Sequence, residues 1–133
     1  MKNLLLIFTL LFTSVFFSSP SYAGWTKVDE GTGSGNRGTI FYVDFERIRK
    51  HDGFVYFWKL MDYLKLTKQG HLSSKIYSQG DCKSFRWKDL SFIPYKEPMG
   101  GGTAGRTFTP PDKWMYPVSY SMDETALKSV CNR

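Results

Sequence analysis

One run of ten residues, from Phe54 to Tyr63, limits the fold of this 133-residue chain more than any other feature. The run reads Phe-Val-Tyr-Phe-Trp-Lys-Leu-Met-Asp-Tyr, so both sets of alternating positions are mostly apolar or aromatic. Alternate side chains of a β-strand point to opposite faces of the sheet. The run therefore predicts a central strand with both faces at least partly covered. Asp52-Gly53 directly before it is typical of a hairpin turn.

Weaker signals of the same kind predict the remaining strands. The expected strands are Trp25–Val28, Thr39–Phe45, Leu72–Gln79 and Lys83–Ile93, with a turn at Gly80-Asp81 between the last two. Residues 46–50 either continue the second strand or form a turn. The stretch from Pro94 to Pro111 is rich in Gly and Pro, which predicts a long irregular connection. One short strand is expected there around Arg106–Thr109, and a short apolar piece follows at Trp114–Val118.

The C-terminal residues predict a helix. Ser121 and Glu124 have the spacing of a capping box, in which each side chain bonds a free backbone N–H of the first turn. Apolar residues then recur at helical spacing: Met122, Ala126, Leu127, Val130 and Cys131. A helix this short needs another element to bury its apolar stripe, so we expect it to pack on the sheet. Strands followed by one helix, without β-α-β alternation, predict an α+β fold with an antiparallel sheet.

The first 23 residues have the organisation of a signal peptide. Lys2 precedes an apolar stretch from Leu4 to Phe17, and Ser21-Tyr22-Ala23 is a typical cleavage site. The alternative is a transmembrane anchor, but threonine and serine residues interrupt a stretch that is already short for a span. We therefore expect residues 1–23 to be a signal peptide and residues 24–133 to form a single domain of 110 residues.

The expected mature chain contains two cysteines, Cys82 and Cys131. In an exported protein two cysteines most simply form one disulfide, which here would fasten the last turn of the helix to the strand edge at Cys82. The disulfide would close a loop of about 49 residues, and closing such a loop stabilises a fold by about 4 kcal/mol in the chain-entropy model. The alternative is a pair of free thiols, one of them a nucleophile.

The charge of the expected mature chain is moderately basic. Without Lys2 it contains 17 Lys and Arg against 12 Asp and Glu, a net charge of +5 with no block of like charge. This balance favours acidic partners, and nucleic acid is not expected for an exported protein. Lys83, Arg86 and Lys88 surround Trp87 and form a weak candidate binding surface for a sulfated glycan, an anionic lipid or an acidic protein. The other interpretation is a half-buried strand with Trp87 in the core and its cations solvated.

Motifs for catalysis, metals or cofactors are weak. Gly33–Gly38 matches G-x-G-x-x-G, but a predicted strand follows it instead of the helix that a dinucleotide site needs. His51 and His71 share no ligand spacing with each other or with the cysteines. Gly100-Gly101-Gly102 could cradle an anion, but we favour a mobile loop as the interpretation. We therefore predict no catalytic, metal-binding or cofactor-binding residue, and no enzyme.

The ordered signals together resemble the surface-adhesin protein E family of Gram-negative bacteria. The matching residues are Gly24-Trp25, Tyr42-Val43-Asp44, Ile48-Arg49, Trp58 to Asp62-Tyr63, Ser73-Ser74-Lys75, Asp81-Cys82, Pro98-Met99-Gly100, Trp114 and Cys131. The resemblance implies a flat antiparallel sheet of about six strands, one helix packed on it, and a disulfide between them. It also implies binding of host matrix or serum proteins. The predicted cleavage precedes Gly24 and not a cysteine, so no lipid anchor is expected.

These observations lead to one functional expectation with one alternative. The chain is expected to be an exported, non-enzymatic binding domain of the cell envelope, periplasmic or at the cell surface, with extracellular or envelope macromolecules as partners. A homodimer is a further expectation, because a second copy could cover the aromatic face of Phe54–Tyr63. The alternative is a periplasmic domain that binds a small ligand between helix and sheet and has no adhesin role.

Overall fold

The computed structural model describes residues 24–31 and 38–133. The predicted signal peptide and most of the Gly33–Gly38 motif lie outside these residues. The described strands are β1 (Trp25–Glu30), β2 (Thr39–Asp44), β3 (Arg49–His51), β4 (Phe54–Tyr63), β5 (Ser73–Asp81) and β6 (Arg86–Tyr95). Two 3₁₀ turns, η2 (Phe45–Arg47) and η3 (Pro98–Gly100), and one helix, α2 (Met122–Cys131), complete the elements of the described residues.

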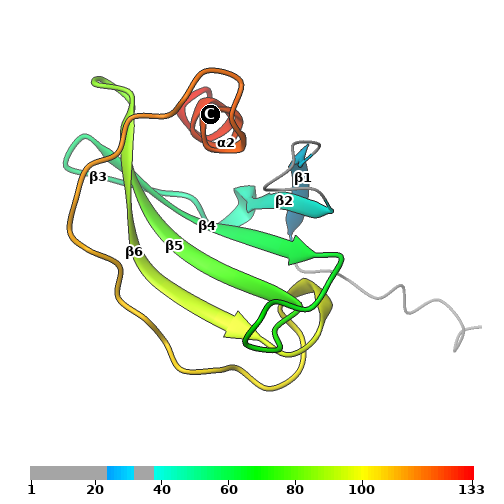
Figure 1. The fold of residues 1–133 in the computed structure, drawn as a ribbon. Coiled ribbons are helices and arrows are strands. Elements are labelled where there is room, and N and C mark those ends of the chain that lie inside the picture. Colours follow the sequence, from blue (N-terminus) through cyan, green and yellow to red (C-terminus); the bar gives the residue numbers. More distant parts are fainter. Residues whose placement is uncertain (1–23, 32–37) are drawn as a thin grey trace, which may run out of the picture.

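The strands form a single antiparallel sheet in the order β1-β2-β4-β5-β6, and β3 also pairs with β4. The central position predicted for Phe54–Tyr63 is therefore confirmed, because β4 pairs with β2 and β3 along one edge and with β5 along the other. The sheet curves around α2, which lies on its concave side (Figure 1). The expectation of a flat sheet was wrong, as antiparallel strands of this length normally twist and coil.

The core lies between α2 and the concave face, called the helix face below. Val55 and Phe57 of β4 pack against Leu127 and Val130 of α2, and all four side chains are buried. Gly80 of β5 makes this contact possible, because a Cβ atom there would lie only 2.8 Å from Val55 Cγ1 and 3.0 Å from Leu127 Cδ1. The absence of a side chain at this position therefore lets the helix approach the sheet closely.

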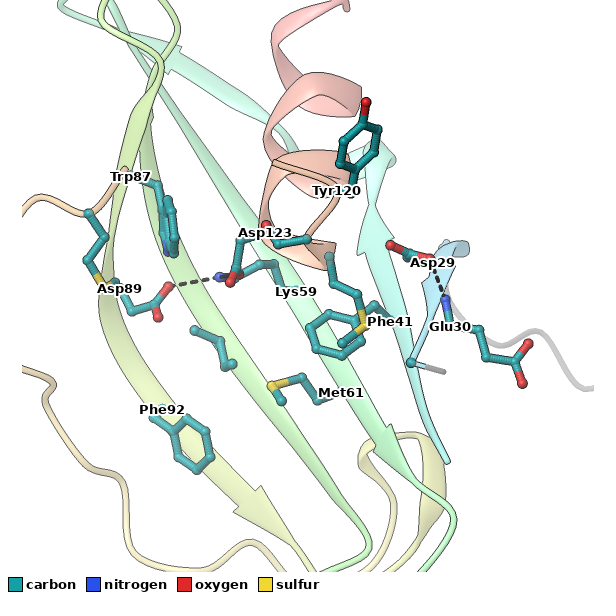
Figure 2. A pocket seen from close by; sticks show the side chains of 15 residues that line it. Asp29, Glu30, Phe41, Lys59, Met61, Trp87, Asp89, Phe92, Tyr120 and Asp123 are labelled. Atoms are coloured by element: carbon teal, nitrogen blue, oxygen red, sulfur yellow. Dashed lines mark hydrogen bonds and ion pairs between the residues drawn. The ribbon is translucent and has the colours of Figure 1, made fainter. Parts of the chain in front are cut away.

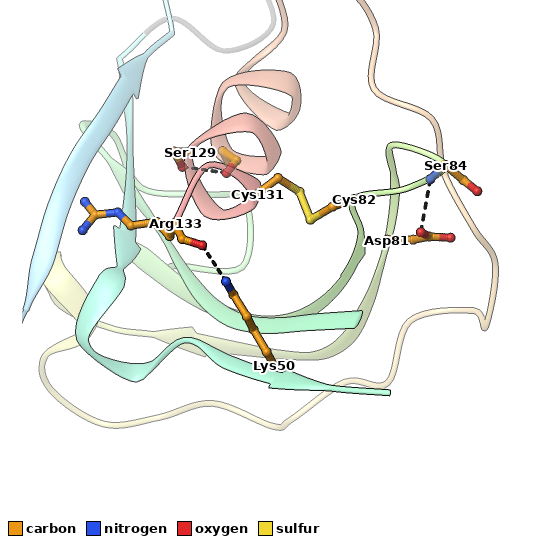
Figure 3. Close-up of a disulfide and its surroundings, with 8 residues drawn as sticks. Lys50, Asp81, Cys82, Ser84, Ser129, Cys131 and Arg133 are labelled. Atoms are coloured by element: carbon orange, nitrogen blue, oxygen red, sulfur yellow. Dashed lines mark hydrogen bonds between the residues drawn. A yellow bond between two sulfur atoms is a disulfide. The ribbon is translucent and has the colours of Figure 1, made fainter. Parts of the chain in front are cut away.

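The cap and the disulfide hold the two ends of α2 as predicted. Ser121 Oγ accepts a hydrogen bond from the Glu124 N–H at 3.2 Å, while the Glu124 carboxylate reaches back to the N–H of Tyr120. At the other end Cys131 is disulfide-bonded to Cys82, directly after β5 (Figure 3). The predicted disulfide is therefore confirmed, and it fastens the last turn of the helix to the sheet.

The turn between β5 and β6 differs from the prediction. β5 continues through Asp81, and the turn occupies residues 82–85. The Asp81 carboxylate accepts hydrogen bonds from the Ser84 N–H at 3.2 Å and from Arg86 Nε at 2.9 Å, and Phe85 has a left-handed φ of +51°. These side-chain bonds fix the turn two residues later than Gly-Asp composition suggests. Lys83 consequently lies in an exposed turn and not in a strand.

The long connection from β6 to α2 runs along the free edge of β6 (Figure 1). It forms isolated bridges at Ala104, Phe108 and Met115. The expected strand at Arg106–Thr109 is thus reduced to the Phe92–Phe108 bridge, because Gly and Pro residues on either side interrupt regular pairing. The region of residues 46–50 forms η2 and the start of β3.

Candidate functional site

Aromatic side chains gather on the convex side of the sheet, called the outer face below. Tyr56 and Trp58 of β4 lie beside Tyr77 of β5, with ring centroids 6.2 Å and 4.9 Å from that of Tyr77. Trp58 and Tyr77 are direct cross-strand partners, so the strand register brings them together. All three side chains are partly exposed. We call these three residues the aromatic platform.

Two short segments cover the ends of the outer face and leave the platform open. At one end η3 packs on the sheet, where the Met99 N–H donates to Asp62 and the Gly100 N–H donates to Ser73 Oγ. At the other end the Trp114 ring stacks on Phe54, with centroids 5.7 Å apart. Among the described residues, no helix or strand lies over the platform between these ends.

The cations of the predicted binding surface separate into two places. Arg86 and Lys88 come together on the outer face, 4.4 Å and 4.7 Å from the centroid of the Trp114 ring. Arg86 pairs with Asp81, and Lys88 Nζ lies 2.8 Å from Asp112. Both side chains are half-buried, whereas Lys83 lies apart in the exposed turn. Trp87 is buried on the helix face, as one of the two interpretations expected.

The Arg86–Asp81 ion pair shifts the pKa of both side chains. The side-chain hydrogen bond from Arg86 lowers the pKa of Asp81 below its ordinary value, and the backbone bond from Ser84 adds to this effect. The same pair raises the pKa of Arg86. Asp81 therefore stays ionised, and it both closes the turn and positions Arg86 against Trp114.

Two further cations on the outer face were not predicted as site residues. Arg49 of β3 is the cross-strand partner of Tyr56, and Lys75 of β5 precedes Tyr77 by two residues. Side chains in these relations share one face of the sheet, so both cations lie at the margins of the platform. Neither has a carboxylate within 4 Å among residues 24–31 and 38–133. Only the pairing of distant strands brings them to the aromatic rings.

The helix face contains a cleft of about 620 Å³ beside the N-terminus of α2 (Figure 2). Lys59 of β4 lies in its floor with only 5% of its side chain exposed. Its Nζ atom lies 2.9 Å from Asp89 Oδ1 and 3.8 Å from Asp123 Oδ1, and Ser78 also donates to Asp89 at 2.7 Å. Burial raises the pKa of Asp123, an effect that Lys59 opposes. The sequence signal for this cluster was the single lysine within an otherwise apolar strand face.

Comparison with known proteins agrees with this fold. The model of the surface-adhesin protein E family matches residues 25–132. The chain belongs to this family. Crystal form II of Haemophilus influenzae protein E aligns with a TM-score of 0.59 and 16% identity, covering 83% of this chain and 88% of that chain. The selenomethionine form of the same Haemophilus influenzae protein aligns with a TM-score of 0.58 and 16% identity, covering 83% of this chain and 87% of that chain. No curated protein matches the chain.

Membership confirms the family resemblance and the fold, and it supports an adhesin-like surface protein. An adhesin family favours binding over catalysis. In the described part of the chain, no group of three or more His, Cys, Asp or Glu residues is arranged to hold a metal ion. No helix of residues 24–31 and 38–133 is long and apolar enough to cross a membrane.

Proposed function

We propose that this member of the protein E family is an exported domain that binds an anionic macromolecule of the extracellular space through its outer face. The observation that carries the proposal is the open aromatic platform with Arg49 and Lys75 at its margins. An exposed aromatic patch rimmed by polar residues is typical of interaction sites, and cations without a carboxylate partner attract an anionic ligand. We favour a sulfated glycan as the partner, because such a chain offers repeated anionic groups together with flat sugar rings.

The predicted surface residues Lys83, Arg86 and Lys88 extend this contact in different degrees. Asp112, the partner of Lys88, is 85% exposed, and exposed ion pairs contribute only about 0–1 kcal/mol. A sulfate group could therefore replace Asp112 at little cost. Asp81 is buried and holds Arg86 more firmly, so Arg86 orients the Trp114 ring more than it recruits a ligand. Lys83 is free to contribute from the neighbouring turn.

The test is retention on immobilised heparin at low and high salt. The protein, purified after export, should bind at low salt and elute as ionic strength passes the physiological range, where charges are screened beyond about 8 Å. The double variant Arg49→Ala/Lys75→Ala should bind roughly tenfold more weakly, if each cation contributes about 0.7 kcal/mol.

The matched control is Lys65→Ala/Lys68→Ala, which removes the same charge from exposed positions in the connection between β4 and β5. Equal weakening in both double variants would show that only net charge matters and would refute the assignment of the face. Binding to an acidic protein but not to heparin would keep the face and change the partner.

The export route and oligomeric state are further parts of the proposal. If the chain is cleaved after Ala23 and carries no lipid anchor, its intact mass should be that of residues 24–133 with an unmodified Gly24 at the N-terminus. Recovery of an uncleaved chain in the inner membrane would refute it. A homodimer formed through the outer face predicts a sedimentation coefficient that falls on dilution, and heparin should compete with it.

A further inference from the structure

The cleft of Figure 2 lies on the helix face, opposite the aromatic platform, and is independent of the proposed function. It is bounded by β1, by the N-terminus of α2 and by the concave surface of the sheet. Its carboxylate, ammonium and indole groups belong to Asp29, Glu30, Asp89, Asp123, Lys59 and Trp87, and Tyr120 and Ser121 also line it. Their hydrogen-bonding state indicates what a ligand must supply.

Trp87 has an indole N–H without an acceptor. The residue is 7% exposed, and its Nε1 atom has no hydrogen-bond partner among the described residues. In Figure 2 the ring nitrogen faces the part of the cleft that holds Lys59 and Asp89. A buried donor without a partner costs about 1–3 kcal/mol, so an acceptor placed here would be bound favourably.

Lys59 is a second donor with unused capacity. An ammonium group has three N–H bonds, and in the described structure one of them meets Asp89 while Asp123 lies at the longer distance of 3.8 Å. The ammonium nitrogen is 5.7 Å from the centroid of the Trp87 ring. One ligand group rich in acceptor oxygens could therefore contact both donors.

The carboxylates of the cleft limit the charge of the ligand. Within residues 24–31 and 38–133, Asp29, Glu30, Asp89 and Asp123 face one lysine in the cleft, and only Glu30 has a further cation, Lys27, as a partner. An anion would be repelled by this excess of negative charge. A simple cation would satisfy the carboxylates but leave the Trp87 N–H without an acceptor. An uncharged ligand that both donates and accepts hydrogen bonds suits all of these groups.

We propose that this cleft binds an uncharged polyhydroxyl ligand of the size of a mono- or disaccharide. Its hydroxyl groups donate to Asp89 and Asp123, and its oxygens accept from Lys59 and Trp87. The cleft volume lies within the range of small-molecule sites. Three methionines, Met61, Met115 and Met122, line the cleft, and their flexible side chains can move to let an oxygen reach the enclosed indole nitrogen.

The experiment is an NMR titration of ¹⁵N-labelled exported protein with sugars of similar size and different charge. The probes are glucose, maltose and N-acetylglucosamine, which are neutral, with the cation glucosamine and the anion glucuronate. A neutral sugar should shift the indole N–H signal of Trp87, which the variant Trp87→Phe identifies by its disappearance. Glucuronate should bind more weakly than the neutral sugars.

Two single-residue variants test whether the sugar binds in this cleft. Asp123→Asn should weaken binding of the neutral sugar about tenfold, because hydrogen bonds to a charged acceptor are stronger than those to a neutral one. Asp52→Asn is the matched control, since Asp52 is exposed far from the cleft and its φ of +51° suits asparagine. This control should bind like the wild type.

Three results would overturn the proposal. The first is no shift of the Trp87 signal with any neutral sugar at millimolar concentration. The second is binding of glucosamine alone, which would make the cleft a simple cation site. The third is equal weakening by Asp123→Asn and Asp52→Asn. If Trp87→Phe does not fold, the Trp87 signal is the one left unassigned after Trp25→Phe, Trp58→Phe and Trp114→Phe, because the expected mature chain has four tryptophans.

Discussion

The two faces of the sheet are built from the same strands but differ in what covers them. On the helix face Val55 and Phe57 of β4 are 3% and 1% exposed beneath α2. On the outer face their neighbours Tyr56 and Trp58 stay partly exposed between η3 and Trp114. A ten-residue helix can cover only one side of a six-stranded sheet. An apolar pattern on both sides of a strand therefore indicates a core on one side and, here, a partly exposed aromatic surface on the other.

Charged side chains also differ between the helix face and the outer face. The helix face holds one buried cation, Lys59, which is matched by Asp89 and approached by Asp123. On the outer face the cations lie around aromatic rings at the margins, where Lys75 is 4.9 Å from the Tyr95 ring centroid. A buried charge needs partners because it has lost water, whereas a half-exposed cation keeps part of its hydration. The cation of the helix face thus lies in a buried ion-pair cluster, whereas those of the outer face keep part of their exposure.

Neighbouring alanine substitutions in β4 give the sharpest comparison. Phe57→Ala should lower the free energy of unfolding by about 3–5 kcal/mol, because it removes a fully buried ring from the core. Trp58→Ala removes a larger ring but should cost less, since that ring is only partly buried, and it should weaken heparin retention more. Urea unfolding of both variants is the measurement. A greater loss of stability in Trp58→Ala would show that the outer face is also core.

Removing the charge of Lys59 tests the buried cation. Lys59→Met should cost about 3 kcal/mol, because Asp89, whose side chain is only 21% exposed, is then left without its cation. The double variant Lys59→Met/Asp89→Leu should recover much of this loss, since no charge remains unpaired. Lys65→Met, at an exposed site, should change stability little. A double variant less stable than Lys59→Met would mean that Asp89 stabilises the fold without Lys59.

Breaking the disulfide should loosen the helix face first. The double variant Cys82→Ser/Cys131→Ser should lose about 2–5 kcal/mol, as is usual for native bridges in small exported domains. Amide exchange should increase in the last turn of α2 more than in β4 and β5. Faster exchange across the whole sheet to the same extent would show that helix and sheet unfold as one unit.

The smallest expected effect concerns Asp81 on the outer face. Because Arg86 lowers the pKa of Asp81 in the folded protein, its ionised form stabilises the fold above the ordinary pKa of aspartate, about 3.9. This contribution is lost as the pH falls through the lowered folded-state pKa. Wild type should therefore exceed Asp81→Asn in stability at pH 7, and the difference should shrink in acid. A difference that grows as the pH falls would contradict the assigned role.

The sequence by itself determined the elements whose signals are local or strongly repeated. The central strand at Phe54–Tyr63, the capped helix after Ser121 and the Cys82–Cys131 disulfide were all predicted correctly, because alternation, capping and cysteine number act through neighbouring residues or a single pairing. The family was recognised from the order of many weak motifs along the chain.

The tertiary structure alone decided the position of the turn after β5 and the make-up of both candidate sites. Asp81 closes that turn through Arg86, and Trp114 reaches Phe54 from 60 positions further along the chain. Lys59, Asp89 and Asp123 meet only when β4, β6 and α2 have packed. Contacts between residues so distant in sequence depend on strand order, register and curvature. Those are properties of the assembled sheet, which no local pattern of residues specifies.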